Sequence, residues 1–331
     1  MQAQSKIYVA GHSGLVGSAL VRRLNATGYS NIVTRTHSEL DLTDPRRVRD
    51  FFERERPDYV FMAAARVGGI VANNSYPAEF IRQNLAIQLN VIDECWRSEV
   101  NRQIFLGSSC IYPRECPQPI KEEYLLTGPL EPTNRPYAVA KIAGIEQCWA
   151  YNRQYGTQNL AVMPTNLYGP GDHYDLSTSH VLPALIRKAH EAKVAGNKEL
   201  IVWGTGDPRR EFLYVDDMAD ACLFLANLPE PEFRSLLGSE STAPLINVGY
   251  GSDLTIRELA ELVARIMGFN GRVEFDSSKP DGTPRKWLDS SRILRMGWKP
   301  LTDFEEGIRK TYEDYMKSLS NDRSQIAESA R

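Results

Sequence analysis

A tyrosine and a lysine four residues apart on a predicted helix have side chains that can exchange protons with a bound substrate. Pro136 suits the first turn of a helix, where its missing N–H costs nothing, and Asn134 can cap it, so we expect a helix over 135–155. Tyr137 and Lys141 then lie on one face, one turn apart. A nearby ammonium favours the phenolate, which predicts proton exchange near neutral pH. Such pairs are also common on ordinary helices, so the assignment depends on the rest of the chain.

A glycine-rich turn near the N-terminus predicts a dinucleotide site. Residues 6–10 read as a strand, and GHSGLVGSALVRRL reads as a turn that leads into a helix. Gly11 permits the tight turn, Gly14 lets a pyrophosphate approach the helix N-terminus, and Gly17 allows close packing of helix and strand. We expect cofactor contacts along the turn, at Gly11, His12, Ser13, Gly14, Leu15, Val16 and Gly17.

The end of the second predicted strand, residues 31–36, favours NADP(H) over NAD. NAD-preferring folds often place an acidic residue there for the ribose 2′-OH, whereas this chain has Arg35 and His37. Ser13, inside the glycine turn, adds no positive charge for a 2′-phosphate, which keeps NAD as the alternative.

The alternation of predicted strands and helices indicates the α/β class, as a Rossmann doubly wound parallel sheet with a smaller mixed α/β C-terminal substrate domain. We expect residues 1–170 to form the NADP-binding Rossmann domain, with a strand near 245–249 returning to it. Residues 171–331 are expected to form mainly the substrate domain, and the polar tail 320–331 is expected to be mobile.

The composition is that of an ordinary globular protein. Hydrophobic residues make up 42% of the 331 residues and the net charge is −3, so neither nucleic acid nor a membrane is an expected partner. The start has no signal-peptide core and no apolar run approaches ~18 residues, which predicts a cytoplasmic protein. The five cysteines lack CxxC spacing, so no metal site and no disulfide framework is expected.

Further polar residues follow predicted strands, where ligands of parallel sheets bind. The strand QIFLGSSCIY delivers Ser108 and Cys110, which share a face if the chain stays extended, although a buried structural cysteine is the alternative. A helix expected to begin at Ser179 places His180 where it can face a cleft, or simply at a polar helix start.

Two regions of the second half suit a nucleotide. Trp203 and Arg210 flank the turn GTGDPR, and an aromatic plane with a guanidinium fork matches a base and its phosphates. The loop KPDGTPRK holds Asp281 and Lys286, although charged loops are usually just solvated. The helix expected over 77–99 is apolar on several faces, so it and the Tyr137 helix are buried either in the monomer or in a subunit interface.

Together these segments resemble, in order and spacing, sugar-nucleotide epimerase-reductases of the extended short-chain dehydrogenase/reductase family. The resemblance covers residues 6–315 and rests on GHSGLVGS, AAARVGGIVANN, LGSSCIYP, EPTNRPYAVAKIAG, MPTNLYGP, SHVLPAL, VWGTGDPRREFLYVDD and KPDGTPRK. It implies a homodimeric enzyme that uses NADPH to convert GDP-4-keto-6-deoxy-D-mannose into GDP-L-fucose. The reaction is epimerisation at C3 and C5 of the hexose, followed by reduction of the C4 ketone.

The resemblance also implies residue roles. Ser108, Tyr137 and Lys141 match the reductase triad, and Cys110 and His180 match a proton-handling pair for the epimerisation. A thiol and an imidazole, with pKa values near ~8.5 and ~6.5, can each donate or accept a proton near neutral pH. The implied further cofactor contacts are Arg35, His37, Asp41, Leu42, Ala64, Leu106, Gly107, Ser108, Lys141, Pro164, Thr165, Asn166, Leu167 and His180. The implied substrate contacts are Asn166, Val181, Lys188, Trp203, Arg210, Asp281 and Lys286.

Three departures from the family pattern and three rival functions remain. Ser13 and Lys188 stand where arginine is usual, and GDHYDLST replaces a different loop before His180. A 4,6-dehydratase or 4-epimerase is disfavoured because no acidic pair follows Ser108. An enzyme for a related GDP-4-keto-deoxyhexose fits the same motifs. A non-catalytic NADP sensor is disfavoured because Tyr137 and Lys141 are both present.

Overall fold

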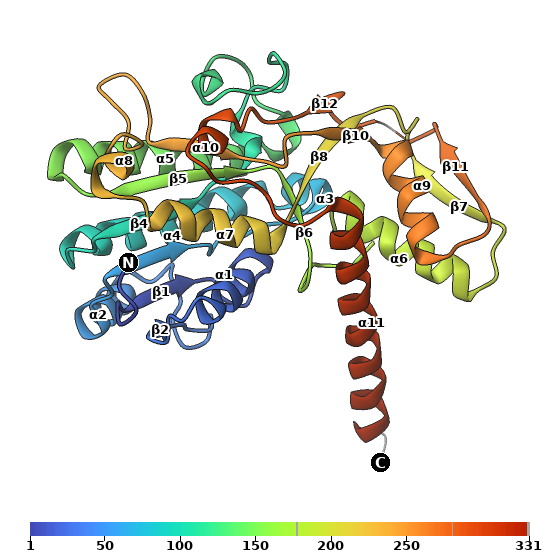
Figure 1. The fold of residues 1–331 in the computed structure, drawn as a ribbon, viewed down its shortest axis with the longest axis horizontal. Coiled ribbons are helices and arrows are strands. Elements are labelled where there is room, and N and C mark those ends of the chain that lie inside the picture. Colours follow the sequence, from blue (N-terminus) through green and yellow to red (C-terminus); the bar gives the residue numbers. More distant parts are fainter. Residues whose placement is uncertain (177, 280, 330–331) are drawn as a thin grey trace.

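A six-stranded parallel sheet forms the larger part of the protein in the computed structural model, which describes residues 1–329 except 177 and 280 (Figure 1). Side chains of residues 70, 71 and 321–329 lie outside the described part. The strand order is β2-β1-β3-β4-β5-β9, and every neighbouring pair is parallel. The strands are β1 (Ile7–Ala10), β2 (Ile32–Val33), β3 (Tyr59–Met62), β4 (Arg102–Leu106), β5 (Asn159–Pro164) and β9 (Leu245–Val248). The predicted α/β class with a Rossmann-type parallel sheet is confirmed.

Helices cover both faces of this sheet. Because side chains alternate along a strand, Ile7 and Val9 of β1 join one apolar core, while Tyr8 and Ala10 join the other. The first core is closed by α1 (Leu15–Ala26), α7 (Val215–Ala226), α8 (Glu230–Arg234) and α10 (Ser291–Arg295). The second is closed by α2 (Pro45–Glu55), α4 (Pro77–Arg97) and α5 (Arg135–Tyr155), and α3 (Ile70–Ser75) precedes α4. Segments from beyond residue 171 therefore complete the core of the large sheet.

The smaller part of the protein holds two small sheets and a third core. The antiparallel pair β10 and β8 is joined by two parallel partners of β8, namely β6 and β12, while β7 and β11 form a separate pair. The Thr255 side chain and the Glu258 carboxylate form a capping box at the start of α9. The elements are β6 (Asn166–Tyr168), β7 (Glu199–Trp203), β8 (Arg209–Tyr214), β10 (Asp253–Thr255), β11 (Arg272–Asp276), β12 (Arg285–Lys286), α6 (Val181–Val194) and α9 (Ile256–Met267).

Three local expectations differ from the structure. The strand expected to reach Cys110 ends at Leu106, and a 3₁₀ turn, η1 (Ser109–Ile111), replaces its extended end. Ser108 caps that turn, because its Oγ accepts a hydrogen bond from the Cys110 N–H at 3.4 Å. The helix expected from Ser179 begins at Val181, with His180 as its N-cap. Strand β2 is shorter than the predicted 31–36. Two further 3₁₀ turns are η2 (Glu122–Tyr124) and η3 (Pro132–Asn134).

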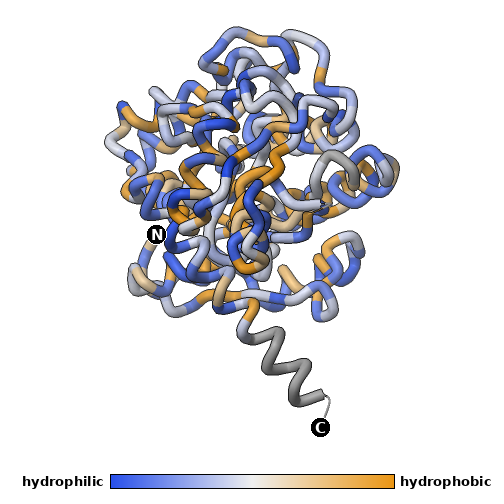
Figure 2. Tube along the Cα trace, turned by 90° about the vertical axis from the view of Figure 1, so that its right-hand side faces the viewer, coloured by the Kyte–Doolittle hydropathy of each residue, from blue (hydrophilic) through white to orange (hydrophobic). Residues whose placement is uncertain are grey.

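The last helix, α11 (Phe304–Ser329), extends away from the body of the protein (Figure 1). The predicted mobility of the tail from residue 320 stays a prediction, because the side chains from 321 on and residues 330 and 331 are outside the described part. Hydrophobic stretches of the chain lie mainly in the middle of the molecule and hydrophilic ones along its outline (Figure 2). Within the residues described, no helix combines the length and apolarity that a membrane span requires.

Candidate active site

One pocket of about 830 Å³ lies over the carboxyl ends of the large sheet and brings most of the predicted site residues together. It is lined by Gly11, Ser13, Gly14, Leu15, Val16, Gly17, Arg35, His37, Asp41, Leu42, Ala64, Leu106, Gly107, Ser108, Cys110, Tyr137, Lys141, Pro164, Thr165, Asn166, Leu167, His180 and Lys286. His12 and the predicted substrate residues Val181, Lys188, Trp203, Arg210 and Asp281 are not part of its lining. The pocket therefore joins the glycine turn to the residues expected to handle protons.

Two positions of the glycine turn, Gly11 and Gly17, have no room for a side chain. Gly11 has φ +79°, and a Cβ there would lie 2.7 Å from the Ala64 Cα, while a Cβ on Gly17 would lie 2.6 Å from the Gly11 carbonyl carbon. Gly14 caps α1 without any side-chain hydrogen bond, and a Cβ there meets only the Gly11 carbonyl oxygen, at 3.5 Å. The N-terminus of α1 is thus accessible to an anion, which fits the pyrophosphate of a dinucleotide.

Arg35 lines the pocket just after β2, and three contacts with the protein fix its guanidinium. Its Nη2 donates to Glu55 Oε1 at 2.7 Å, its Nη1 donates to the Thr34 carbonyl oxygen at 2.7 Å, and the guanidinium carbon lies 5.5 Å from the Phe51 ring centroid. Since a guanidinium has five N–H donors, donors remain for a phosphate. With His37 also in the pocket wall, this end fits a 2′-phosphorylated ribose.

Tyr137 and Lys141 project from the first two turns of α5 toward the end of β4. Lys141 is buried, and its Nζ donates to the Leu106 carbonyl oxygen at 2.7 Å and lies 5.9 Å from the Tyr137 ring centroid. Burial lowers the pKa of Lys141 to about 8. Burial also raises the pKa of Tyr137 above its ordinary value, against the opposing effect of a hydrogen bond with Ser108.

The expected phenolate at Tyr137 is therefore wrong for the protein without ligands. Desolvation disfavours the phenolate more than the surrounding polar groups favour it, so the phenol keeps its proton near neutral pH. A protonated tyrosine beside Ser108 can donate a hydrogen bond, and then a proton, to an oxygen in the pocket.

Cys110, His180 and Lys286 form a second proton-handling group in the same pocket. Burial raises the pKa of the Cys110 thiol, while the Lys286 charge, the Ser108 hydrogen bond and the Lys141 charge act in the opposite direction. The His180 side chain is accessible through the pocket but has dense protein around it, so burial and the charges of Lys286 and His173 lower its pKa. A thiol and a neutral imidazole are therefore the resting forms at neutral pH.

The remaining predicted substrate residues lie on a path that leads away from the pocket. Lys286 of β12 pairs in register with Arg210 of β8, and the Arg210 guanidinium lies close to Asp281. Asp281 accepts hydrogen bonds from the Thr205 N–H at 3.0 Å and the Thr205 hydroxyl at 2.7 Å. Trp203, at the end of β7, is 62% exposed, which leaves its ring free to stack.

Lys188 reaches the same place from α6. Its Nζ lies 5.0 Å from the Trp203 ring centroid and donates to the Ile201 carbonyl oxygen at 3.4 Å. The aromatic ring of Trp203 beside Lys188 suits the base of a nucleoside diphosphate, and the cations Arg210 and Lys286 suit its phosphates.

The sequence analysis did not identify two asparagines of the pocket wall as site residues. Asn134 was expected to cap α5, and this expectation is wrong, because its side chain makes no capping hydrogen bond and its Oδ1 is buried without a hydrogen bond in the described part of the chain. The Asn73 side-chain amide donates to the Gly68 and Gly69 carbonyl oxygens at 2.7 and 3.0 Å, and its Oδ1 is likewise buried and unpaired among the described residues. Both lie in quoted motifs, yet their orientation is set by tertiary contacts, which spacing does not reveal.

No cluster of three or more histidine, cysteine or carboxylate side chains with metal-binding geometry occurs within the described residues.

The sequence profile of the NAD dependent epimerase/dehydratase family matches residues 7–234. The chain belongs to this family. The expected membership of the extended short-chain dehydrogenase/reductases, which share this fold and these motifs, is confirmed.

Relatives within the family are similar over almost the whole chain. GDP-L-fucose synthase 1 of Arabidopsis thaliana is 54% identical over 96% of this chain and 95% of its own length. GDP-L-fucose synthase of Escherichia coli (strain K12) is 51% identical over 96% of this chain and 98% of its own. The structure of a GDP-D-glycero-L-gluco-heptose synthase from Campylobacter jejuni, determined in the presence of NADPH, is 38% identical with a TM-score of 0.89, over 96% of this chain and 99% of that one.

Proposed function

We propose that this enzyme converts GDP-4-keto-6-deoxy-D-mannose into GDP-L-fucose by 3,5-epimerisation and NADPH-dependent 4-reduction. The observation that carries the proposal is that Cys110, His180 and Tyr137 line the same pocket as the glycine turn. One bound sugar can then meet the proton-handling groups and the cofactor without leaving. GDP-L-fucose synthases that share 51% and 54% identity with the chain support this activity.

The residues present fit NADP(H). The open N-terminus of α1 at Gly14 accepts the pyrophosphate, and Arg35, fixed by Glu55, offers its remaining N–H donors to the 2′-phosphate. When bound, the dinucleotide supplies the hydride for C4. Since Ser13 contributes no charge, Arg35 carries most of the attraction for the 2′-phosphate.

Epimerisation needs a base on one face of the hexose and an acid on the other. Hydrogens on C3 and C5 are acidified by the C4 ketone, and both lie on the same face of the sugar ring. One group of the Cys110–His180 pair removes the proton, the enolate forms, and the other group protonates the opposite face. Because two inversions use the same groups in the same direction, the pair must exchange protons with solvent in between, and His180 is accessible to solvent through the pocket.

The C4 oxygen is the common focus of both reactions. Ser108 and the protonated Tyr137 lie together, so they can hydrogen-bond the enolate oxygen and later the alkoxide. In the reduction, Tyr137 gives its proton to the C4 oxygen as hydride reaches C4, and the buried Lys141 charge stabilises the phenolate that remains. Lys141 thereby acts on the tyrosine after proton transfer.

We assign the GDP moiety to the residues that run from Lys286 to Trp203. We assign the diphosphate to Lys286 and Arg210, which are register partners, and the base to the exposed Trp203 ring beside Lys188. Asp281, held by Thr205, borders the base. In this arrangement residues 1–170 with β9 serve mainly the cofactor, and residues 171–331 serve mainly the GDP-sugar.

Two properties of the whole protein are proposed alongside. Free cysteines throughout the described chain fit the reducing cytoplasm.

A homodimer through α4 and α5 is supported by the exposed apolar side chains Leu85, Leu89 and Val139 on these helices. Light scattering of the purified protein tests the dimer, and a monomer at micromolar concentration contradicts it.

Product identification tests the proposed activity. The purified protein is incubated with GDP-4-keto-6-deoxy-D-mannose and NADPH, and the sugar is identified by nuclear magnetic resonance. The expected product is GDP-L-fucose, whereas a reduced sugar that keeps its original C3 and C5 configuration contradicts the epimerase half. The second candidate substrate is a related GDP-4-keto sugar, favoured by the 38% identity to the heptose synthase, and a higher kcat/KM for such a sugar in the same assay identifies it.

A further inference from the structure

Glu211 of β8 has a fully buried carboxylate with no basic partner in the part of the chain that the structure describes. Oε1 accepts the Gly251 N–H at 2.8 Å, and Oε2 accepts the Leu288 N–H at 3.1 Å. Burial raises the pKa of Glu211 to about 7, and hydrogen bonds from backbone N–H groups and from the Thr165 side chain oppose that rise. The Glu211 carboxyl group, whose charged form is costly to bury, is therefore held by two separate backbone segments.

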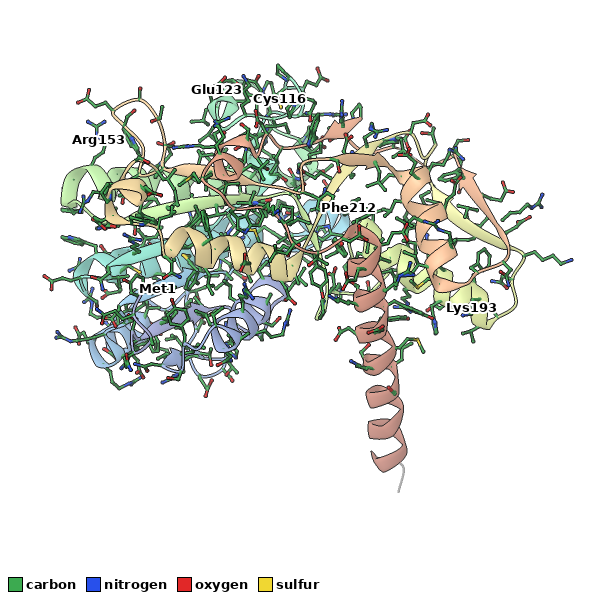
Figure 3. All side chains as sticks on the ribbon, viewed as in Figure 1. Met1, Cys116, Glu123, Arg153, Lys193 and Phe212 are labelled. Carbon is green, nitrogen blue, oxygen red and sulfur yellow. The ribbon has the colours of Figure 1, made fainter. Side chains whose placement is uncertain are left out.

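The backbone of the same residue reaches the cofactor side of the pocket. The Glu211 carbonyl oxygen accepts the Thr165 hydroxyl at 3.1 Å and the Asn166 side-chain amide at 2.8 Å, and both of these residues line the pocket. The next side chain, Phe212, is labelled near the middle of the molecule in Figure 3 and belongs to the third core, that of the smaller part. Glu211 thus stands where the cofactor half and the sugar half meet.

The segment held at Leu288 carries Lys286 two residues earlier. Strand β12 pairs with β8 over only two residues, so the strand pairing alone fixes Lys286 weakly. Beyond it, the Ile120–Leu288 bridge and the Ile120 N–H bond to the Trp287 carbonyl oxygen, at 2.7 Å, join this segment to the loop that follows Cys110. The Glu211–Leu288 hydrogen bond therefore helps to fix the position of Lys286 relative to Arg210 on β8 and relative to the loop that follows Cys110.

Gly249 gives an independent sign that the carboxylate position matters. A Cβ at Gly249 would lie 2.7 Å from Glu211 Oε2 and closer still to Oε1. Gly249 is not among the glycines with positive φ, so its backbone conformation is open to other residues. The three atoms nearest to such a Cβ all belong to the Glu211 carboxylate group, so this group occupies the space that a side chain at Gly249 needs.

We propose that Glu211 is a positioning residue of the active site, which holds Leu288 and Gly251 so that Lys286 and Arg210 stay aligned for the GDP-sugar. The inference rests on the function proposed above. It predicts a selective effect, because the hydrogen bonds that the Thr165 hydroxyl and the Asn166 side-chain amide donate to the Glu211 carbonyl oxygen are made to its backbone and survive replacement of its side chain.

Glu211→Gln tests the proposal with little change of shape. The glutamine side chain keeps one oxygen as an acceptor, but its NH₂ group faces a backbone N–H. Either the Gly251 N–H or the Leu288 N–H therefore loses its hydrogen bond. We expect the Kd for GDP, measured by calorimetry, and the KM for the GDP-sugar to rise at least about fivefold, which corresponds to one lost hydrogen bond. Deuterium exchange at C3 and C5 should slow by a similar factor, and the Kd for NADPH should change less than about twofold.

Two further variants separate positioning from general stability. Gly249→Ala displaces the carboxylate without removing it and should raise the Kd for GDP in the same way, and it decides the matter should Glu211→Gln not fold. Asp217→Asn is the matched control, because Asp217 is also buried and accepts hydrogen bonds from Thr302, outside the pocket lining. It should lower thermal stability and leave the Kd for GDP unchanged.

Two results would overturn the inference. One is wild-type GDP affinity and exchange rate in both Glu211→Gln and Gly249→Ala, and the other is an equal loss of GDP and NADPH affinity. A wild-type protein that binds GDP but does not turn over the keto sugar contradicts the proposed function instead, and the GDP affinities still test Glu211.

Discussion

The Lys141 ammonium donates to the Leu106 carbonyl oxygen at 2.7 Å, which fastens α5 to the end of β4 directly beneath the tyrosine of the same helix. Because Lys141 is 3% exposed, its charge acts on Tyr137 through protein rather than water. The hydrogen bond uses one of its three donors, so the ammonium is fixed in place and can still stabilise a phenolate after the proton has left.

Tyr137→Phe removes the proton donor and leaves the ring packed. We expect NADPH oxidation with the keto sugar to fall by ~10²-fold or more, with little change in the Kd for NADPH. Tyr151→Phe on the same helix is the control, because its hydroxyl donates to Asp93 at 2.8 Å and does not line the pocket. Near wild-type turnover in Tyr137→Phe would rule out its role as the proton donor.

The lowered pKa of Lys141, about 8, predicts a pH-dependent stability difference between wild type and Lys141→Met. Between about pH 8 and 10.5 the unfolded lysine binds a proton that the folded one does not, so wild-type stability rises with pH relative to the variant. From pH 7.5 to 9.5 the difference should change by about 2 kcal/mol in urea unfolding. Parallel curves for the two proteins would show that burial does not shift this lysine.

Arg35→Ala tests cofactor choice. We expect the preference for NADPH over NADH in kcat/KM to fall at least ~10-fold, since the charge facing the 2′-phosphate is lost. Arg54→Ala is the matched control, because Arg54 also lies near Glu55, at 3.5 Å, but is not in the pocket lining. An unchanged preference in Arg35→Ala would place 2′-phosphate recognition elsewhere.

Cys110→Ser should suppress epimerisation far more than reduction, because a hydroxyl is much too weak an acid to replace the thiol near neutral pH. The variant should exchange little deuterium into C3 and C5 and should slowly reduce the unepimerised ketone. Cys116→Ser, which removes a thiol outside the pocket lining, should behave as wild type. Exchange at the wild-type rate in Cys110→Ser would leave Cys110 a space-filling residue.

The sequence predicted the parts of the site that depend on local geometry. A glycine turn between a strand and a helix, and a tyrosine one helical turn before a lysine, define their own arrangement, and the structure has both. The extended chain expected at Cys110 was wrong because a 3₁₀ turn begins once β4 ends, and hydrophobic pattern does not distinguish the two.

Properties that depend on burial or on contacts between distant segments could not be predicted from the sequence. The phenol of Tyr137 keeps its proton because the folded chain buries it, and spacing along one helix cannot report that desolvation. The hydrogen bond from the Leu288 N–H to the Glu211 carboxylate joins residues that are 77 positions apart. The same limit applies to Glu55, whose bond to Arg35 comes from the neighbouring helix α2.

The position of solvent label in the product tests the account most directly. The wild-type protein is incubated in deuterium oxide with GDP-4-keto-6-deoxy-D-mannose and NADPH, and the product sugar is analysed by nuclear magnetic resonance. We expect GDP-L-fucose with deuterium at C3 and C5 and protium at C4, because Cys110 and His180 exchange protons with solvent whereas the hydride does not. A reduced sugar with protium at C3 and C5 would contradict it.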